Sequence, residues 1–480
     1  MTRMSRSRAG RAARLGGLVG AEAAKAAANR ATDLVRSHED GYVAASTRNT
    51  LLAERVVAVL GSMRGVAMKF GQLLSLVDPG IVAAEHRDLF QSTLASLQDS
   101  APRVPWERMR RHLESELGAK LEVVFDEFDP RPVAAASIGQ VYRARLPDGR
   151  EVAVKAQYPD IASMVVADLA NLRTLLTAYR LIHPRLDTAA LADEIELRMR
   201  EELDYRLEAR HTGRLAAEFR GHPFIRIPDI VPELSGQRVI VMDWLDGRPL
   251  RAAYDAPRAE RDRIAEILFR FYCGTPHLLR FYSADPHPGN VLLLADGAVG
   301  FVDFGLCQAL DAATAEAEAA ALRAGVEGDL DRILDLMEAR GFAARSAVSP
   351  EGAYELFLRV FGWYLRDEEV EITPDVAAGL VALLGVGRLS IGSPLRPYNL
   401  PPEHVMRGRA ELQLVALLGK LRPRLNLHAI AREWLFDAEP KTELGRAQRD
   451  WHLRHRPGSA PSMPETSEIR QSASRSTVTR

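Results

Sequence analysis

One block in the second half of the sequence places carboxylate and amide side chains at close, defined spacing. Residues 284–290 read Ala-Asp-Pro-His-Pro-Gly-Asn, so Asp285 precedes Asn290 by five positions. Two short apolar runs follow around an Asp-Gly turn, and the second run leads to Asp303 in an Asp-Phe-Gly tripeptide. When such runs pair as a hairpin, Asn290 and Asp303 come together at its open end. Phosphoryl transfer requires this kind of set: a carboxylate beside the nucleophile and oxygen ligands that hold Mg²⁺ against phosphates.

Each piece of this block also has a simpler interpretation. An Asp-Phe-Gly tripeptide is common, and Asp285 alone could cap a turn. His287 stands between two prolines without a cluster of Cys or His near it, so we interpret it as structural and not as a metal ligand. Taken together, with a hairpin between them, the pieces favour a nucleotide site over chance.

A second candidate group surrounds Lys155, which ends the apolar run Val152-Ala153-Val154. A lysine at the end of a buried strand needs a carboxylate or a phosphate to offset its desolvation, although many such lysines simply reach solvent. Small residues precede this strand and would let the backbone approach phosphates, or would form an ordinary tight turn. They are Ala134, Ala135, Ala136, Ser137, Gly139 and Gln140.

Acidic residues form a third group on a predicted helix between residues 161 and 219. Glu201, Asp204 and Glu208 share one stripe of that helix, and Glu202 lies beside it. A solvated face is the ordinary interpretation of such a run. Lys155 suggests a second one, because a strand lysine paired to a helix glutamate orients ATP phosphates in kinases.

The elements that must position these groups alternate between helix and sheet. Helical periodicity is predicted from 33 to 116, broken by Pro102 and Pro105, and again from 161 to 219 with a break at His183-Pro184. Between them, residues 133–157 predict a β-hairpin around a Pro-Asp-Gly turn. A short buried strand at 239–241 leads into a mostly helical half that contains the second hairpin. This order predicts a two-lobed α+β protein.

Composition narrows the class of protein further. The 480 residues carry a formal net charge of −1, which gives no argument for a nucleic-acid partner. Two cysteines, Cys273 and Cys307, suit a reducing cytoplasm. No apolar segment reaches the roughly 18 residues of a membrane-spanning helix. The basic start of the chain leaves three alternatives open: a disordered tail, attachment to an anionic membrane, or an organelle transit peptide. We expect a cytoplasmic protein, with peripheral attachment to the inner face of the membrane as the alternative.

The motifs, in this order, resemble the UbiB/AarF family of atypical protein-kinase-like proteins. Lys69-Phe70-Gly71-Gln72 resembles the Lys-x-Gly-Gln signature of that family. The stretch from Ala135 to Val141 resembles its alanine-rich loop, and Glu202-Leu203-Asp204 resembles its Glu-x-Asp element. The match runs from about Leu51 to Leu310, with weaker support to about Leu435. One departure is Ser283, where the family usually has His, and this changes how the catalytic loop is braced.

The resemblance implies a two-lobed protein-kinase-like fold with an N-terminal helical extension packed over the active site. The expected parts are a basic, disordered tail (1–32), the helical extension (33–118), the N-lobe (119–244), the helical C-lobe (245–438) and a polar, disordered tail (439–480).

The resemblance also implies ATP and Mg²⁺ as cofactors. Lys155 would hold the α- and β-phosphates and pair with Glu208, and Asp285 would be the catalytic carboxylate. Asn290 and Asp303 would bind Mg²⁺. Main-chain groups around Met242 to Trp244 would receive the adenine, and the segment Ala135, Ala136, Ser137, Gly139 and Gln140 would cover the phosphates. Lys69, with Gln72 in the same motif, would meet Glu202 or Asp204 where a protein substrate would otherwise lie.

Three functions fit these features. The first is an atypical kinase or ATPase that acts on small-molecule or lipid-linked metabolism, with an isoprenoid or quinone precursor as the expected partner beside ATP and ADP. The second is a non-catalytic nucleotide-dependent switch or lipid chaperone. The third is a soluble small-molecule phosphotransferase, which shares the Asp-x-x-x-x-Asn loop but lacks the Lys69 motif and the alanine-rich loop. The substrate and the oligomeric state are not encoded in any motif.

Overall fold

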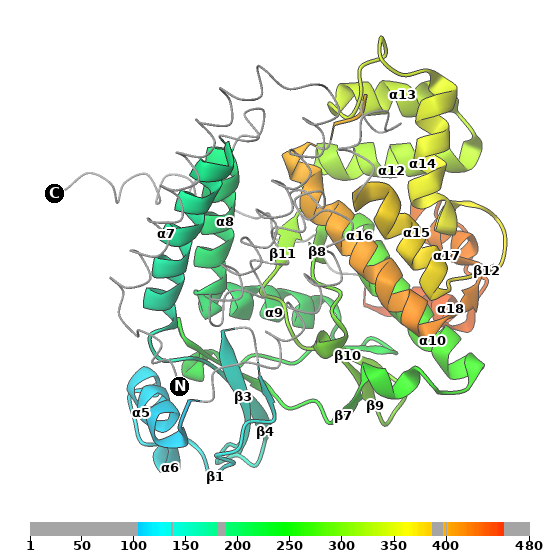
Figure 1. The fold of residues 1–480 in the computed structure, drawn as a ribbon. Helices are drawn as coiled ribbons and strands as arrows, with labels where there is room; N and C mark the ends of the chain where they lie inside the picture. Colours follow the sequence, from blue (N-terminus) through cyan, green and yellow to red (C-terminus); the bar gives the residue numbers. More distant parts are fainter. Residues whose placement is uncertain (1–103, 136–137, 181–187, 386–396, 400, 456–480) are drawn as a thin grey trace, which may run out of the picture.

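A computed structural model describes residues 104–135, 138–180, 188–385, 397–399 and 401–455. The Lys-x-Gly-Gln motif with Lys69 and Gln72, the extension before residue 104, and Ala136 and Ser137 lie outside the described residues. So do the basic start of the chain, the break predicted at His183-Pro184 and residues 456–480. The described part has two lobes, with the sheet of β3 and β4 and the pair α7–α8 on one side and the helices from α10 onward on the other (Figure 1).

The smaller lobe is built on a five-stranded sheet of order β1-β3-β4-β6, with β2 paired to β3. Its central hairpin confirms the predicted one, because a tight turn at Gly149, with φ of 86°, reverses the chain between β3 and β4. The buried strand predicted at 239–241 is also confirmed, as β6. The strands are β1 (Glu127–Phe128), β2 (Ala134–Ala135), β3 (Gly139–Arg145), β4 (Glu151–Gln157) and β6 (Val239–Asp243).

Helices cover this sheet and complete its core. Met109 and Leu113 on α5 are fully buried with the strand residues Val152 and Val154. Residues 106–117 therefore belong to the core of this lobe, although the domain boundary predicted at 118 placed them in the extension. The helices of the lobe are α5 (Trp106–Leu117), α6 (Leu121–Val124), α7 (Ile161–Arg180), α8 (Thr188–Glu202) and α9 (Tyr205–Glu218).

The acidic run does not lie on one continuous helix, and that prediction was wrong. Helix α8 ends at Glu202 and α9 begins at Tyr205. Asp204 between them has extended backbone angles, and its side chain accepts a hydrogen bond from the Arg206 N–H, which caps α9. Short acidic side chains favour such caps over helix interiors, so the same residue that suggested a helical stripe ends the helix.

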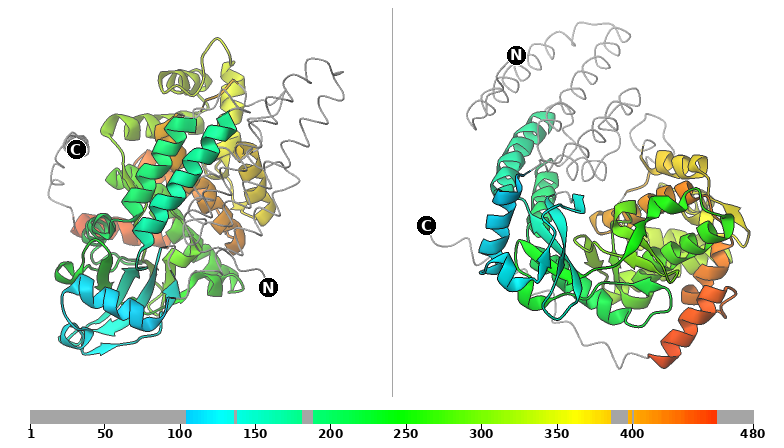
Figure 2. Two further views of the ribbon diagram at one scale, coloured as in Figure 1. Left: turned by 60° about the vertical axis from the view of Figure 1, so that its left-hand side comes forward. Right: turned by 90° about the horizontal axis from the view of Figure 1, so that it is seen from below.

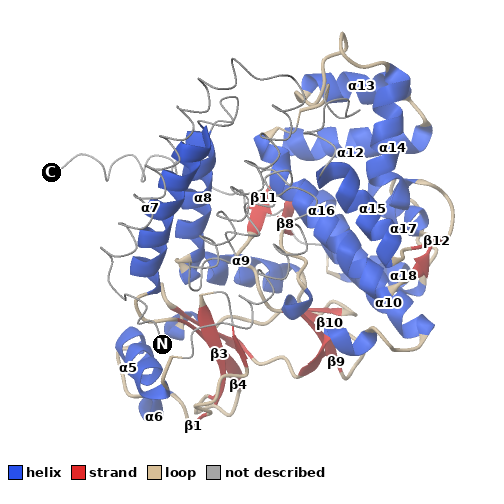
Figure 3. Ribbon diagram, viewed as in Figure 1, coloured by secondary structure: helices blue, strands red, loops and turns tan. Residues whose placement is uncertain are grey.

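The larger lobe is mostly helical, as predicted, and Figure 3 shows its few strands against the helices. The predicted second hairpin is present as β9 (Val291–Leu294) and β10 (Val299–Phe301), with Val291 opposite Phe301. Two further strands extend it into a sheet of order β5-β10-β9-β7, made with β5 (Ile225–Arg226) and β7 (Gly247–Pro249). A separate two-stranded sheet joins β8 (Phe281–Ser283) to β11 (Cys307–Ala309).

The helices of the larger lobe pack around one core that includes Phe269, Phe271 and Phe301. Arg270–Gly274 continue α10 as a π-helical turn. The remaining elements are α10 (Arg258–Phe269), α11 (Thr275–Leu279), α12 (Ala312–Glu327), α13 (Leu330–Ala339), α14 (Pro350–Leu365), β12 (Val370–Glu371), α15 (Pro374–Gly385), α16 (Pro402–Leu421), β13 (Arg424–Leu425), α17 (Leu427–Leu435) and α18 (Glu443–Arg454).

Part of the predicted C-terminal disordered tail is folded, which corrects the sequence analysis. Residues 443–454 form α18, whose Thr442 cap accepts from the Gly445 N–H. Trp451 is 6% exposed and lies against Phe219 and His222, which follow α9. The segment is polar overall, so composition alone suggested a tail, yet Trp451 is buried. Figure 2 shows the segment as a regular helix, in orange-red.

Candidate active site

The structure brings Lys155, Glu208 and Asp303 together from three elements. The Lys155 Nζ on β4 lies 2.6 Å from Glu208 Oε1 on α9 and 2.9 Å from Asp303 Oδ2, which follows β10. The Lys155 and Glu208 side chains are 8% and 5% exposed, and Asp303 is 30% exposed. The ion pair predicted between Lys155 and Glu208 is therefore present in the described structure. Lys155 also pairs with Asp303 of the Asp-Phe-Gly segment in the other lobe.

Burial and charge act against each other in this group. Burial alone would lower the pKa of Lys155, yet the carboxylates of Asp303 and Glu208 raise it well above its ordinary value. Burial raises the pKa of Glu208, and Lys155 opposes that shift. Lys155 is therefore a permanent cation, held where a phosphate could join or replace a carboxylate as its partner.

The start of β3 packs closely against β4 and α9 beside this site. A Cβ atom on Gly139 would lie 2.2 Å from the Ala156 carbonyl oxygen and 3.0 Å from the Tyr205 hydroxyl. No other residue type fits there without moving the backbone, so Gly139 allows β3 to pair closely with β4, the strand that carries Lys155. Thr212 on α9 donates its hydroxyl hydrogen to the Glu208 carbonyl one turn earlier.

The second part of the site is the segment between β8 and β9. Asn290 Nδ2 lies 3.2 Å from Asp285 Oδ2 and 3.2 Å from the Asp285 carbonyl oxygen, so the amide fixes the turn that carries the carboxylate. The Val302 N–H donates to the Asn290 carbonyl oxygen at 3.1 Å. Asn290 and Asp303 are therefore neighbours across the open end of the hairpin, as its pattern predicted. His287 accepts from the Gly289 N–H, which agrees with a structural role.

The Asp-Phe-Gly segment is held by contacts on both sides. Asp303 Oδ1 accepts from the Gly305 N–H at 3.1 Å. His211 Nδ1 on α9 lies 3.0 Å from the Phe304 carbonyl oxygen, which can only accept, so this nitrogen carries the proton. Burial lowers the pKa of His211, which keeps the ring neutral at physiological pH. Sequence reasoning missed His211, although it follows Glu208 by three positions on the same helix.

Of the two acids of the Glu-x-Asp element, one faces the site and one does not. A Cβ atom on Gly305 would lie 3.5 Å from Asp303 Oδ1, 3.7 Å from Glu202 Oε1 and 3.8 Å from Glu208 Oε2, so three carboxylates converge there. Asp204 instead pairs with Arg206 through two contacts of 2.9 Å, and hydrogen bonding from that arginine lowers the pKa of Asp204.

Arg409 on α16 is a further site residue that sequence reasoning missed. Its Nη2 atom lies 3.4 Å from Asp285 Oδ1, and its Nη1 atom lies 3.4 Å from the Ala284 carbonyl oxygen. The two side chains are 6% and 13% exposed. No local motif marks this arginine, because its relation to Asp285 exists only after α16 folds across the lobe.

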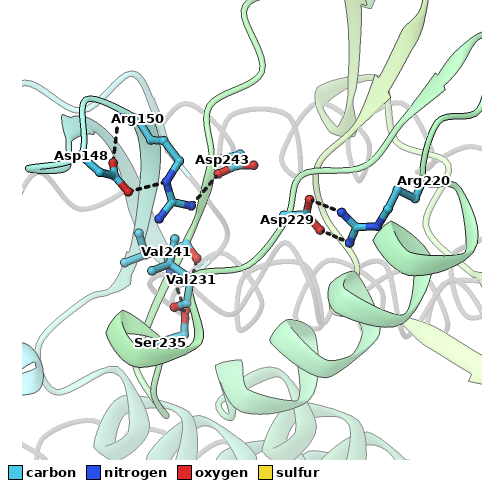
Figure 4. Close-up of polar contacts among 8 residues, drawn as sticks. All are labelled: Asp148, Arg150, Arg220, Asp229, Val231, Ser235, Val241 and Asp243. Carbon is cyan, nitrogen blue, oxygen red and sulfur yellow. Dashed lines mark hydrogen bonds and ion pairs between the residues drawn. The ribbon is translucent and has the colours of Figure 1, made fainter.

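Side-chain ion pairs hold the connection between the lobes (Figure 4), and main-chain N–H groups there have partners within the protein. The Asp243 N–H donates to the Asp229 carbonyl oxygen, and the Trp244 N–H donates to the Glu151 carbonyl oxygen. Side chains reinforce the same segment, with Arg150 beside Asp243 and Arg220 bound to Asp229. The assignment of adenine to Met242–Trp244 stays a prediction, and these two N–H groups already have partners.

The residues present suit magnesium held jointly with phosphates. Asn290 directs its Nδ2 at Asp285, which leaves the amide oxygen for another partner, and Asp303 supplies a carboxylate beside it. Within the described residues, no group of three or more His, Cys, Asp or Glu side chains could hold a metal ion. Mg²⁺ is usually bound by one or two protein oxygens together with substrate phosphates, so this donor set fits that mode.

A two-lobed α+β fold with a strand lysine, a helix glutamate and paired Asp-Asn and Asp-Phe-Gly segments defines a kinase-like protein. Residues 96–337 match the ABC1 atypical kinase-like domain. The chain belongs to this family, which confirms the resemblance to UbiB/AarF proteins seen in the sequence.

Similar proteins include "Protein ACTIVITY OF BC1 COMPLEX KINASE 1, chloroplastic" of Arabidopsis thaliana, which is 36% identical over 48% of this chain and 35% of its own length. "Atypical kinase COQ8B, mitochondrial" of Rattus norvegicus is 32% identical over 61% of this chain and 56% of its own length. Among solved structures, the complex of Rv3197 with erythromycin from Mycobacterium tuberculosis matches with a TM-score of 0.59 and 28% identity. That match covers 82% of this chain and 98% of the other.

The matched region spans about a third to a half of the length of several curated relatives. Across the part of the chain that the structure describes, no helix is long and apolar enough to cross a membrane.

Proposed function

We propose that this protein binds Mg-ATP and uses it as an atypical kinase or ATPase. The observation that carries the proposal is the position of Lys155, 2.6 Å from Glu208 and 2.9 Å from Asp303, at a site that also holds Asp285 and Asn290. Burial of the Lys155 and Glu208 charges is costly, and clusters of charges with perturbed pKa values are typical of functional sites.

In this proposal each side chain has one task. Lys155 binds the α- and β-phosphates, and Glu208 fixes its direction. Asn290 and Asp303 hold Mg²⁺, which neutralises charge on the phosphates. Asp285 accepts the proton from the attacking hydroxyl or water as that oxygen bonds to the γ-phosphorus and the bond to ADP breaks. The alanine-rich segment around Ala135 and Gly139 covers the phosphates through its backbone.

The acceptor we propose is a small or lipid-linked molecule of the isoprenoid or quinone-precursor class. This rests on the resemblance of the Lys69 motif to an element that occupies the place of a protein substrate, and on membership of the family. The basic start of the chain supports peripheral contact with an anionic membrane surface. ATP and ADP are the other partners, and nucleic acid is not expected.

A second candidate is a nucleotide-dependent switch that binds an apolar molecule without turning ATP over. It is favoured by the solved structure of Rv3197, which is a complex with erythromycin. Under this alternative, ligand binding would depend on nucleotide and survive the change Asp285→Ala.

The test is Mg²⁺-dependent ATP turnover by the purified chain, with and without anionic liposomes, beside Asp303→Asn. Asp255→Asn makes the same chemical change at an exposed position of the larger lobe and serves as the control. Turnover that rises with lipid and is lost only in Asp303→Asn supports the proposal. Tight nucleotide binding without turnover supports the switch, and absence of nucleotide binding overturns both.

A further inference from the structure

Helix α16 packs directly onto the two segments that carry the candidate catalytic carboxylates. Met406 and Ala410 of this helix form a small buried cluster with Tyr282 and Ala284, which precede Asp285, and with Leu306, which follows the Asp-Phe-Gly tripeptide. This cluster is separate from the main core of the lobe. One helix from the end of the fold therefore touches both sides of the site.

Arg409 follows Met406 by three residues on α16, so the two side chains share one face of the helix. Its guanidinium is 3.4 Å from Asp285 Oδ1 and 3.4 Å from the Ala284 carbonyl oxygen. The other carboxylate oxygen, Oδ2, accepts from Asn290 at 3.2 Å. Both oxygens of Asp285 are thus held from different elements. An arginine with 6% side-chain exposure is costly without such partners, so the contact restrains both residues.

A second arginine anchors the helix beneath this contact. Arg407 lies with its guanidinium 5.5 Å from the centre of the Tyr282 ring, and donates to the Tyr272 carbonyl oxygen at 3.3 Å. It also pairs with Glu411 at 3.2 Å and Glu318 at 3.7 Å. Glu411 lies on α16 itself, whereas Tyr272, Tyr282 and Glu318 come from three other segments of the lobe. These contacts fix the position of α16, which carries Arg409 to Asp285.

Ser283 contacts the backbone of the segment that carries Asp285. The Asp285 N–H donates to the Ser283 hydroxyl oxygen at 3.5 Å. Such a contact is at the limit of a hydrogen bond and leaves the carboxylate itself unsupported. Support for that carboxylate comes instead from Asn290 and from α16.

We propose that Arg409 is a positioning residue for the transfer step, which orients Asp285 and compensates its charge in the buried site. The proposal rests on the proposed function, because it assigns Asp285 the role of proton acceptor. Arg409 itself is not placed on the phosphates, so its loss leaves the nucleotide site of Lys155, Asn290 and Asp303 intact.

Arg409→Met should therefore separate turnover from binding. We expect kcat to fall about 100-fold, the size of effect that follows when a general base is misplaced, while nucleotide affinity changes less than about threefold. Arg409→Lys keeps the charge without the two-pronged contact and should recover part of the rate.

The experiment measures nucleotide affinity with a fluorescent ATP analogue, and kcat and KM of Mg-ATP turnover. It compares wild type with Arg409→Met and Arg409→Lys. Lys420→Met, at an exposed position of the same helix, is the matched control. The expected pattern supports the proposal. Unchanged kcat in Arg409→Met, an equal loss in Lys420→Met, or a parallel loss of nucleotide affinity would overturn it.

A readout without turnover separates this proposal from the proposed function. If the wild-type protein neither hydrolyses ATP nor transfers its γ-phosphate, the proposed function is refuted. A double-mutant cycle in thermal melting then tests whether Arg409 and Asp285 interact. The cycle combines Arg409→Met with Asp285→Asn. Strongly non-additive losses in melting temperature show that Arg409 holds Asp285, and additive losses overturn the positioning role whether or not ATP is consumed.

Discussion

Replacing Lys155 by methionine tests the charge balance on which the candidate site depends. Methionine has a similar length and suits a buried environment, so the change removes the ammonium group with little loss of packing. The carboxylates of Glu208 and Asp303 then face each other without their shared cation. Because Asp303 is 30% exposed and can be hydrated, most of the penalty falls on Glu208, which is 5% exposed.

The size of the penalty depends on pH because Glu208 can protonate. Burial raises the pKa of this carboxyl, and removal of Lys155 takes away the group that lowers it. Folding then requires Glu208 to be protonated. At pH 7, which lies about 2.5 units above the ordinary pKa of a glutamate, this protonation costs at most about 3.4 kcal/mol, because each unit corresponds to about 1.36 kcal/mol. At pH 5 the same limit is about 0.7 kcal/mol. A folded-state pKa above the unfolded value means that stability is kept at low pH and lost as pH rises.

We therefore expect Lys155→Met to lower the free energy of unfolding by roughly 2–3 kcal/mol at pH 7 and by less than about 1 kcal/mol at pH 5. Urea unfolding followed by tryptophan fluorescence measures this. Lys120→Met is the control, since Lys120 pairs with Glu114 at the surface with 71% of its side chain exposed, and such pairs contribute little. Adding Glu208→Leu should restore much of the stability. A penalty that is absent at both pH values, or larger at pH 5, refutes the reasoning.

Three further predictions concern the scaffold, each checked by thermal or urea unfolding. Gly139→Ala should destabilise by roughly 1–3 kcal/mol because its methyl group meets the Ala156 carbonyl oxygen at 2.2 Å, whereas Gly213→Ala, in open space on α9, should not. Burial lowers the pKa of His222 to about 3, so the stability that the neutral ring contributes is complete above about pH 6.5 and is lost as pH falls. This loss amounts to roughly 3 kcal/mol by pH 4, and His222→Asn should remove it from the acid unfolding profile. Arg270→Met should cost roughly 3–5 kcal/mol, since this fully buried arginine pairs with two glutamates at 2.8 and 2.7 Å. Equal stability of the two glycine variants would contradict the first prediction, and an unchanged acid unfolding profile of His222→Asn would contradict the second. An Arg270→Met protein as stable as wild type would contradict the third.

The parts of the site that could be predicted are those that depend on local sequence patterns. Asn290 and Asp303 lie on either side of a hairpin, and hairpin geometry brings its ends together whatever surrounds it. Lys155 stands in an apolar strand, where burial makes a carboxylate partner necessary, and Glu208 was a suitable candidate on a helix. In each case a local rule and a charge requirement point to the same contact.

The parts that could not be predicted depend on competition between local rules or on distant contacts. Asp204 fits a helical stripe and a helix cap equally well, and only packing of α8 and α9 selects the cap. Trp451 lies in a segment whose composition suggests a tail, and its burial depends on a pocket formed by residues more than 200 positions earlier. Arg409 approaches Asp285 from 124 positions away, and no periodicity records such a contact.

The arrangement around Lys155 has a consequence for how nucleotide and metal would enter. Lys155 belongs to one lobe and Asp303 to the other, and their contact of 2.9 Å occupies both the proposed phosphate ligand and the proposed metal ligand. A nucleotide that takes Lys155 leaves Asp303 and the converging carboxylates of Glu202 and Glu208 facing its phosphates. Repulsion among these like charges is relieved when a divalent cation takes Asp303 at the same time. Under the proposed function, the charges of the site would favour joint binding of the metal and the nucleotide over binding of either alone. Lys155 would be the counter-ion of Asp303 and Glu208 in their absence.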